Sequence, residues 1–252
     1  MKVVSDLMIK VPLITFNTHI TKARRILRDD EFREIYVTDE HRHLMGCLDI
    51  TDAIRVTDTK SNVTVEGFIR EAPAVRPADA ITDAARLIRD CRTDSAAVVD
   101  EDRGVIGAIL LSDIFPIFIN RHKLHGRVAD HMSADVVTCR TDDTIQKIYR
   151  LIVDSGFTAF PVVKKDHLIG IISRTDILRT GKLRSSIKNA ADTKVERIMT
   201  TPVLTVSPED TLTAAAEMLV KHDIGCLPVL QETRLVGVID RHDMLTALNF
   251  TG

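Results

Sequence analysis

The chain has 252 residues, of which 44% are hydrophobic, 28% are charged and 4% are aromatic. This length is sufficient for one large domain or two modest ones with a packed core. The formal net charge of −2 excludes a strong overall attraction to nucleic acid or to a membrane surface. Because tryptophan is absent and aromatics are few, a core of Val, Ile, Leu and Ala is expected, which favours a layered α/β fold.

The cysteines and the N-terminal residues indicate a reducing compartment. Cys47, Cys91, Cys139 and Cys226 are widely separated, so none has a metal-binding or redox spacing, and we expect them to be small buried hydrophobic residues. The N-terminal segment contains Asp6 and lacks the apolar stretch of a signal peptide. No stretch reaches the roughly 18 apolar residues that a membrane span needs. We therefore expect a cytoplasmic protein that binds neither membrane nor nucleic acid.

The N-terminal part of the chain contains a pattern that the rest of the chain repeats. The short segment Val4–Met8 is followed by a first strand and by Ile20, Ala23 and Leu27, whose spacing is typical of an amphipathic helix. Further along the chain, Gly46 and then Asp52 follow the segment. These three landmarks, the segment, the glycine and the aspartate, define the first repeat.

The same landmarks recur three more times with unchanged spacing. The equivalent segments are Val65–Ile69, Val128–Met132 and Val195–Met199, the glycines are Gly107, Gly170 and Gly237, and the aspartates are Asp113, Asp176 and Asp243. A register kept in four places is not expected by chance, and it indicates four copies of one structural unit. The repeats occupy residues 1–60, 61–120, 121–185 and 190–252.

The later repeats show the remaining elements of the unit. In the third, the apolar runs Phe160–Val163 and Leu168–Ile172 are separated by a short polar segment, which predicts two adjacent strands with a tight connection. A second helix is expected to begin at Asp176. Each unit therefore reads as β-α-β-β-α.

Two details predict how the units are grouped. Relative to the end of the preceding landmark segment, the helical stripe begins one position earlier at Ile20 and Ile81 than at Ile145 and Leu212. We therefore expect two modules, one of repeats 1 and 2 and one of repeats 3 and 4. Linkers are expected near residues 57–64, 116–127 and 181–194.

The string Gly170-Ile171-Ile172-Ser173-Arg174-Thr175-Asp176 resembles the signature of CBS domains, the cystathionine-β-synthase-type family. The runs Phe160–Val163 and Leu227–Val229 resemble the strand just before that signature. The resemblance implies an α/β fold in which repeats pair through their sheets, and two such modules forming a flat disk around a central channel. The four-repeat organisation is similar to that of the gamma subunit of AMP-activated protein kinase.

The resemblance also implies a function, that of a regulatory sensor of AMP, ADP or ATP acting on a partner protein. The oxygens of each aspartate can accept hydrogen bonds from ribose hydroxyls, and a nearby Ser or Thr and a helix N-terminus can bind phosphate. The fullest set is in repeat 3, and the base would be held by repeat 4. The residues implied are Ser173, Arg174, Thr175 and Asp176 with Thr200, Val203, Ile224 and Cys226.

The other three sites depart from the signature. Asp243, with Ser133, Val136 and the Phe157–Ala159 segment around the base, follows Asp240 where a Ser or Thr is expected, and a carboxylate there repels phosphate. In repeat 1 Asp49 makes the same departure beside Thr51 and Asp52, and in repeat 2 Leu110 precedes Ser112 and Asp113. We therefore expect the principal site at Asp176, while helix capping is the alternative role for every one of these aspartates.

Three other functions are weighed against nucleotide sensing. The ligand could be another adenosyl compound, S-adenosylmethionine or NAD, because all present the same ribose, or the chain could be a ligand-free docking protein. A DNA-binding regulator is disfavoured because no separate recognition motif remains. No catalysis is expected, since GxxxxGK[ST] and GxSxG motifs are absent and the repeats use up the chain. No metal site is expected, and either a regulated protein or a second copy of the chain is the expected partner.

Overall fold

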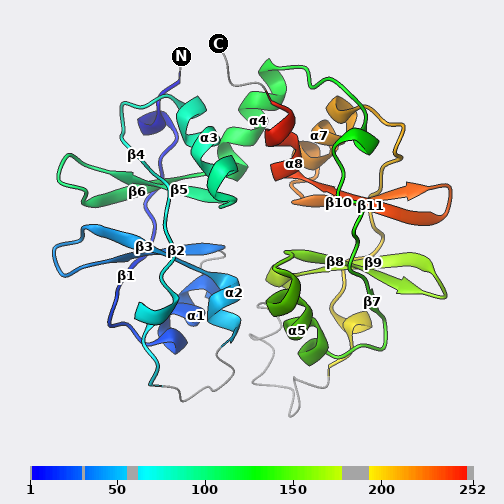
Figure 1. Ribbon diagram of the computed structural model, residues 1–252, viewed down its shortest axis with the longest axis horizontal. Helices are drawn as coiled ribbons and strands as arrows, with labels where there is room; N and C mark the ends of the chain where they lie inside the picture. The colour runs from blue at the N-terminus through cyan, green and yellow to red at the C-terminus, as the bar shows by residue number, and fades with distance from the viewer. Residues whose placement is uncertain (1, 30–31, 56–61, 178–192, 249–252) are drawn as a thin grey trace. The chain divides into compact units, whose positions relative to one another are not determined.

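The computed structural model describes residues 2–29, 32–55, 62–177 and 193–248 (Figure 1). The chain divides into two compact units, of which unit 1 holds the described residues up to His122 together with Leu248, and unit 2 runs from Lys123 to Ala247. Repeats 1 and 2 lie in unit 1, and repeats 3 and 4 lie in unit 2. The predicted grouping of the repeats is therefore confirmed.

Both repeats of unit 1 have the predicted order of elements, each after a short 3-10 helix. Repeat 1 consists of η1 (Val4–Asp6), β1 (Leu13–Thr15), α1 (Ile20–Asp29), β2 (Glu34–Thr38), β3 (Leu44–Asp49) and α2 (Ile50–Arg55). Repeat 2 consists of η2 (Val65–Phe68), β4 (Ala74–Val75), α3 (Ile81–Cys91), β5 (Ser95–Val99), β6 (Val105–Leu110) and α4 (Leu111–Arg121).

Unit 2 follows the same plan with one local difference. Repeat 3 consists of η3 (Val128–Asp130), β7 (Cys139–Arg140), α5 (Ile145–Ser155), β8 (Ala159–Lys164) and β9 (His167–Ser173), followed by helical residues 174–177. Repeat 4 consists of η5 (Val195–Arg197), α7 (Leu212–Lys221), β10 (Cys226–Gln231), β11 (Arg234–Asp240) and α8 (Arg241–Ala247). Its expected first strand is reduced to an isolated parallel bridge between Val206 and Val229.

The sheets of the four repeats have one register. The second strand of each repeat pairs antiparallel with the third, and the landmark glycine of the third strand always faces a valine, as in Val37↔Gly46 and Val162↔Gly170. Where a first strand forms, it adds parallel to the second strand. Helices cover one side of each sheet, so that in unit 1 α1 and α2 lie beyond one sheet and α3 and α4 beyond the other (Figure 1).

Within each unit, the two repeats exchange their lead segments, defined here as residues 2–10, 62–71, 126–134 and 193–201. In unit 1, the Ile9 amide donates to Ala108 of β6 and the Cys47 amide of β3 donates to Arg70, both at 2.9 Å. In unit 2, Ser133 pairs in the same way with Val238, and Thr200 with Ile171. Each lead segment therefore completes the sheet of the other repeat.

The landmark glycines permit this close approach. A methyl group at Gly107 would lie 2.7 Å from the carbonyl oxygen of Ile9, and one at Gly170 would lie 2.6 Å from the sulfur of Met199. Real side-chain carbons do not approach other heavy atoms so closely, so the constant spacing of the glycines has a steric cause. It places a residue without a side chain where the other repeat's lead segment crosses.

The core consists of the helical stripes packed on the sheets. Most stripe residues are buried in every repeat, including Ile20, Ala23 and Leu27 of α1, Ile81, Ala84, Ala85 and Ile88 of α3, Ile145, Ile148 and Ile152 of α5, and Leu212, Ala215, Ala216 and Leu219 of α7. Tyr149, Val153 and Val220 of the same stripes are only partly buried. Apolar side chains at helical spacing lose the most water-exposed area when they face a sheet, so this burial follows directly from the sequence pattern.

The predictions for one linker and for two of the cysteines were wrong. The linker expected from Pro116 is helix, because α4 continues through Pro116 to Arg121 and buries Phe115 and Phe118, whose packing offsets the missing amide hydrogen bond. Cys91 is exposed because it is the last residue of α3, and Cys226 is partly exposed. Cys47 and Cys139 are buried as expected, and burial raises the pKa of each thiol to about 12. The other two expected linkers lie largely outside the described residues.

Candidate functional site

Ser173 and Asp176 form a reciprocal helix cap at the end of β9. The amide and the hydroxyl of Ser173 donate to Oδ2 of Asp176, at 2.8 and 2.6 Å, and the amide of Asp176 donates to the Ser173 hydroxyl oxygen at 3.2 Å. The N-cap residue is therefore Ser173, and Asp176 is the third residue of the first helical turn, not its start as the sequence suggested. Both side chains are partly exposed. The carboxylate therefore lies within reach of solvent, between the end of a strand and the N-terminus of a helix.

The equivalent position in repeat 4 holds two carboxylates. The amides of Asp240 and Asp243 donate to each other's side chains, both at 2.9 Å, so Asp240 replaces Ser173 in the cap. Burial, and then the neighbouring charge of Asp240, raise the pKa of Asp243 to about 7. The departure noted in the sequence therefore has an electrostatic consequence, because this site gains negative charge as the pH rises through neutrality.

The lead segments bring polar residues of one repeat to the strand that precedes the other repeat's cap. Thr200 exchanges two backbone hydrogen bonds with Ile171, just before Ser173, and Ser133 exchanges two with Val238, just before Asp240. Thr200 and Ser133 are both exposed. Each of these two lead segments thus pairs with the strand that ends just before the other repeat's cap.

The residues expected around the base differ in exposure. Val203, Ile224, Cys226, Val136 and Ala159 are partly exposed, and Phe157 is 40% exposed, which is unusual for so large an apolar side chain. Thr175 is also partly exposed, but Arg174, expected to face a phosphate, is only 8% exposed, and its amide donates to the Thr158 carbonyl. Arg174 faces solvent much less than the sequence suggested.

The aspartate of repeat 1 is already engaged within unit 1. Nη2 of Arg70 donates to Oδ1 of Asp52 at 2.7 Å, Nε of Arg70 lies 2.6 Å from Oδ2, and the Asp52 side chain is 3% exposed. Arg70 immediately follows the landmark segment of repeat 2, so it is equivalent to Thr200. Nearby, the Thr51 amide donates to Asp49. Sequence reasoning missed Arg70, although its place in the repeat register was visible.

Repeat 2 presents a simpler arrangement. Leu110 occupies the N-cap position of α4, and its side chain cannot accept a hydrogen bond. Ser112 and Asp113 are both exposed on the first turn of that helix. This cap therefore has no counterpart of the Ser173–Asp176 pair.

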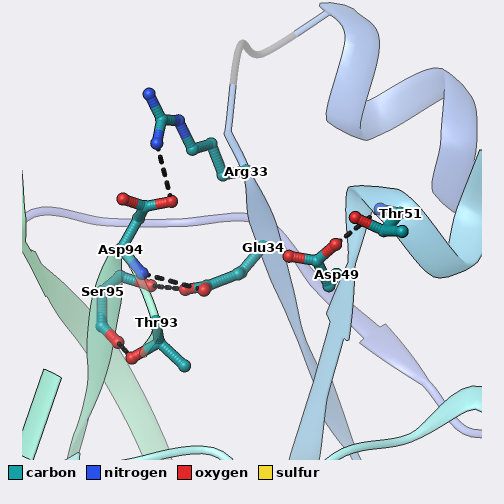
Figure 2. Close-up of polar contacts among 7 residues, drawn as sticks. All are labelled: Arg33, Glu34, Asp49, Thr51, Thr93, Asp94 and Ser95. Carbon is teal, nitrogen blue, oxygen red and sulfur yellow. Dashed lines mark hydrogen bonds and ion pairs between the residues drawn. The ribbon is translucent and has the colours of Figure 1, made fainter. Parts of the chain in front are cut away.

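A buried polar cluster joins the two repeats of unit 1 (Figure 2). The Glu34 carboxylate of β2 accepts hydrogen bonds from the Ser95 hydroxyl of β5 at 2.6 Å and from the Asp94 amide at 2.9 Å, and Tyr36 shares a hydrogen bond of 2.6 Å with Ser95. Arg33 binds the Asp94 carboxylate at 2.9 Å. This cluster was not predicted, because its partners belong to different repeats and lie far apart in the sequence.

Glu34 is strongly perturbed by these surroundings. It is 9% exposed, and burial, together with the charges of Asp94 and Asp49, raises its pKa to about 7, although the hydrogen bonds from Ser95 and the Asp94 amide act in the opposite direction. A carboxyl group with this pKa is only partly ionised at neutral pH. The junction of the two repeats therefore contains a group that titrates in the physiological range.

The comparison with protein families agrees with this geometry. The model of the CBS domain matches four segments, residues 4–58, 65–119, 128–182 and 195–249. The chain belongs to the CBS domain family. CBS domain proteins are generally regulatory and sense nucleotides or adenosyl ligands. The four matched segments coincide with the four repeats defined by the landmark spacing.

Relatives and solved structures extend the comparison. The chain is 27% identical to the uncharacterized protein MJ1225 of Methanocaldococcus jannaschii over 159 residues, which are 60% of this chain and 57% of MJ1225. It is 35% identical to a homoserine O-acetyltransferase of Methanococcoides burtonii over 128 residues, which are 50% of this chain and only 25% of that enzyme. The matched regions thus span less than two thirds of these two relatives.

The fold is shared with two crystal structures across almost the whole chain. MJ1225, which has been proposed as an archaeal homologue of g-AMPK, superposes with a TM-score of 0.81 at 21% identity, covering 97% of this chain and 99% of that one. An uncharacterized conserved protein of Pyrococcus horikoshii gives a TM-score of 0.65 at 21% identity and the same coverage. At this identity the likeness concerns the fold alone.

Two further observations concern the described residues. None of their helices has the length and apolar character required to cross a membrane. Within the same part of the chain, no three His, Cys, Asp or Glu side chains are grouped as a metal site would require.

Proposed function

We propose that the chain is a regulatory sensor that binds an adenine nucleotide in unit 2, chiefly at Asp176, and acts on a partner protein. The observation that carries this proposal is the Ser173–Asp176 cap with Thr200 of the other repeat paired beside it. A carboxylate at a helix N-terminus offers acceptors to the ribose hydroxyls, while the first-turn amides favour a phosphate.

The exposure of the surrounding apolar residues supports the same assignment. Phe157 and Ile224 occupy equivalent places before β8 and β10, and both remain partly open to solvent. An adenine ring could bury this apolar area, and burial of that kind provides most of the favourable free energy of small-ligand binding. The second position of unit 2, at Asp243, carries the extra carboxylate of Asp240 and is expected to bind polyphosphates more weakly.

The regulatory role follows from the same features. Landmark repeats fill the chain, and no phosphate-cradling loop is present in its sequence, so we propose that bound nucleotide is sensed and not turned over. A thermal-shift panel of AMP, ADP, ATP, S-adenosylmethionine and NAD distinguishes an adenine-nucleotide sensor from a sensor of another adenosyl ligand. A chain that responds to none of them would be a docking protein instead.

Calorimetric titration of AMP and ATP into the parent chain and two variants, Asp176→Ala and Asp113→Ala, tests the site. Asp176→Ala is expected to weaken binding about 10- to 150-fold, because it removes charge-assisted hydrogen bonds worth roughly 1.5–3 kcal/mol. Asp113→Ala is the matched control, since it removes the equivalent carboxylate from a helix that lacks the serine cap. Unchanged binding by Asp176→Ala, or loss of binding in Asp113→Ala alone, would show that the principal site is not at Asp176 of unit 2.

A further inference from the structure

Unit 1 differs from unit 2 at the positions that the proposed function assigns to the nucleoside. In the repeat register, Thr200, Ile224 and Cys226 of repeat 4 are equivalent to Arg70, Thr93 and Ser95 of repeat 2. By the same register, Ala159 of repeat 3 is equivalent to Glu34 of repeat 1. The strand pairing supports these equivalences, because Glu34, Ser95, Ala159 and Cys226 all begin the second strand of their repeat and each faces the last residue of the third.

The first nucleoside position of unit 1 is filled by Arg70. Its guanidinium holds both oxygens of Asp52, the carboxylate that corresponds to Asp176, in a two-pronged contact at 2.6 and 2.7 Å. Ribose hydroxyls would have to replace a cation at a carboxylate that is almost fully buried. Neutral hydroxyls form weaker hydrogen bonds to a carboxylate than a guanidinium does, so this exchange is unfavourable.

The base positions of unit 1 are filled by the polar cluster. Glu34 and Ser95 are buried and hydrogen-bonded to each other across the two repeats, whereas their counterparts Ala159 and Cys226 are partly exposed. The ion pair between Arg33 and Asp94 adds a second link between the same two segments. A base entering here would separate a buried carboxyl group from its hydrogen-bond donors, and buried polar groups without partners are costly.

We propose that unit 1 holds both of its nucleoside positions closed with its own side chains, Arg70 and Ser95 at one and Glu34, hydrogen-bonded to Ser95, at the other, so that nucleosides bind to unit 2 alone. This inference rests on the proposed function for the location of the sites. It assigns the two units different roles. Unit 2 binds the ligand, and unit 1 is a self-filled module whose polar links fix the pairing of its repeats.

Opening unit 1 provides the test. Glu34→Ala with Arg70→Thr gives unit 1 the residues found at Ala159 and Thr200, and Glu66→Ala with Arg76→Thr makes the same changes at exposed positions as the control. The probe is adenosine, which has no phosphate for Asp49 to repel. Hydrogen–deuterium exchange with and without adenosine locates binding in residues 69–75 and 93–98 of unit 1 or residues 199–206 and 224–229 of unit 2.

In the parent and the control, protection by adenosine is expected in unit 2 only. In the opened variant, adenosine should also protect unit 1 from exchange, and its affinity for unit 1 should be at least about tenfold above that in the parent. Protection of unit 1 in the parent overturns the inference, and so does a folded opened variant that gains none. If unit 2 never responds but the opened unit 1 does, the proposed function fails while the closure of unit 1 stands.

Loss of Arg70 leaves Asp52 buried without a cation, so the opened variant is first checked by its melting transition. If it does not fold, Arg70→Gln replaces Arg70→Thr, because the glutamine amide can still donate one hydrogen bond to Asp52. The same gain of protection in unit 1 is then expected, and its absence again overturns the proposal.

Discussion

Ser173 and Asp176 each accept a hydrogen bond from the backbone amide of the other at the junction of β9 and the helical turn that follows. The carboxylate proposed to bind ribose is therefore also part of the local fold. Any variant at either position changes the helix cap as well as the ligand site, so stability and affinity must be measured together.

Two variants separate these roles. Ser173→Ala removes the cap and is expected to lower the free energy of unfolding by about 1 kcal/mol, with the adenosine affinity within about threefold of the parent. Asp176→Asn keeps an oxygen that can accept from Ser173 but loses the charge, so it should weaken adenosine binding about tenfold at little cost in stability. Denaturant unfolding and calorimetry measure both effects. If affinity falls in step with stability in both variants, Asp176 acts only through the helix.

The carboxylate pair of repeat 4 predicts a gain of function. Asp240→Ser gives repeat 4 the cap residue of repeat 3 and removes the charge that helps to raise the pKa of Asp243 to about 7. The pKa of Asp243 should fall, and AMP should bind to the second position of unit 2 more tightly at pH 8. NMR titration of the Asp243 carboxyl and calorimetry at pH 6 and pH 8 test this. Asp240→Asn provides a control that retains the size of the original side chain, and an unchanged pKa in both variants would contradict the electrostatic explanation.

The steric role of the landmark glycines is testable by a matched pair of substitutions. Gly107→Ala places a methyl group against the Ile9 carbonyl and should lower the free energy of unfolding by about 1–3 kcal/mol. Gly67→Ala adds a methyl group that meets no atom within 4 Å beyond its immediate neighbours in the chain, and it should be neutral or slightly stabilising. Thermal melting compares the two. Equal melting temperatures would mean that the lead segment does not depend on the glycine.

Glu34 predicts a dependence of stability on pH. Its pKa is raised from 4.5 to about 7 in the folded chain, so the folded state binds the proton more tightly than the unfolded state does. The contribution of this proton to the free energy of unfolding is complete below about pH 4.5 and is lost as the pH rises through 7. Glu34→Gln has no carboxyl group to titrate, so this loss of stability, on the order of 3 kcal/mol, should not occur. Between pH 4.5 and pH 8, unit 1 of the variant should therefore lose less stability than unit 1 of the parent.

Denaturant unfolding between pH 4.5 and pH 8 measures the effect. Exposed Glu101→Gln is the control and should follow the parent. Asp243 contributes in the same direction, so Glu34→Gln is also compared in a background of Asp243→Asn. Parallel curves for Glu34→Gln and the parent would show that the Glu34 carboxyl is not the titrating group.

The fold could be predicted from sequence because its main signals are local and repeated. The stripe Ile81, Ala84, Ala85, Ile88 is buried as its spacing predicts, and the glycine register coincides with one strand pairing in all four repeats. The linker prediction at Pro116 was wrong because it followed from a single residue that often ends a helix. Phe115 and Phe118 on either side of it pack into the core, and α4 continues.

The candidate site was less accessible to such reasoning. The signature located Asp176 and Asp243, but the contact of Asp52 with Arg70 and that of Glu34 with Ser95 join residues of different repeats. No local periodicity reports a contact of this kind. The repeat register does show that Arg70 and Glu34 stand where unit 2 has a threonine and an alanine. A charged residue at such an equivalent position was therefore the sequence feature that could have indicated these contacts.

The exchange of lead segments also sets an order for folding during synthesis. Ile9 leaves the ribosome long before the strand that it joins, which is complete only after Ala108 and Leu110 have been made. The sheet of repeat 1 also depends on Arg70, which belongs to the lead segment of repeat 2 and places a cation beside the carboxylate of Asp52. The shortest nascent chain able to reach the native state therefore contains two repeats. A chain stalled on the ribosome after the first repeat would have an unfinished sheet with an exposed edge.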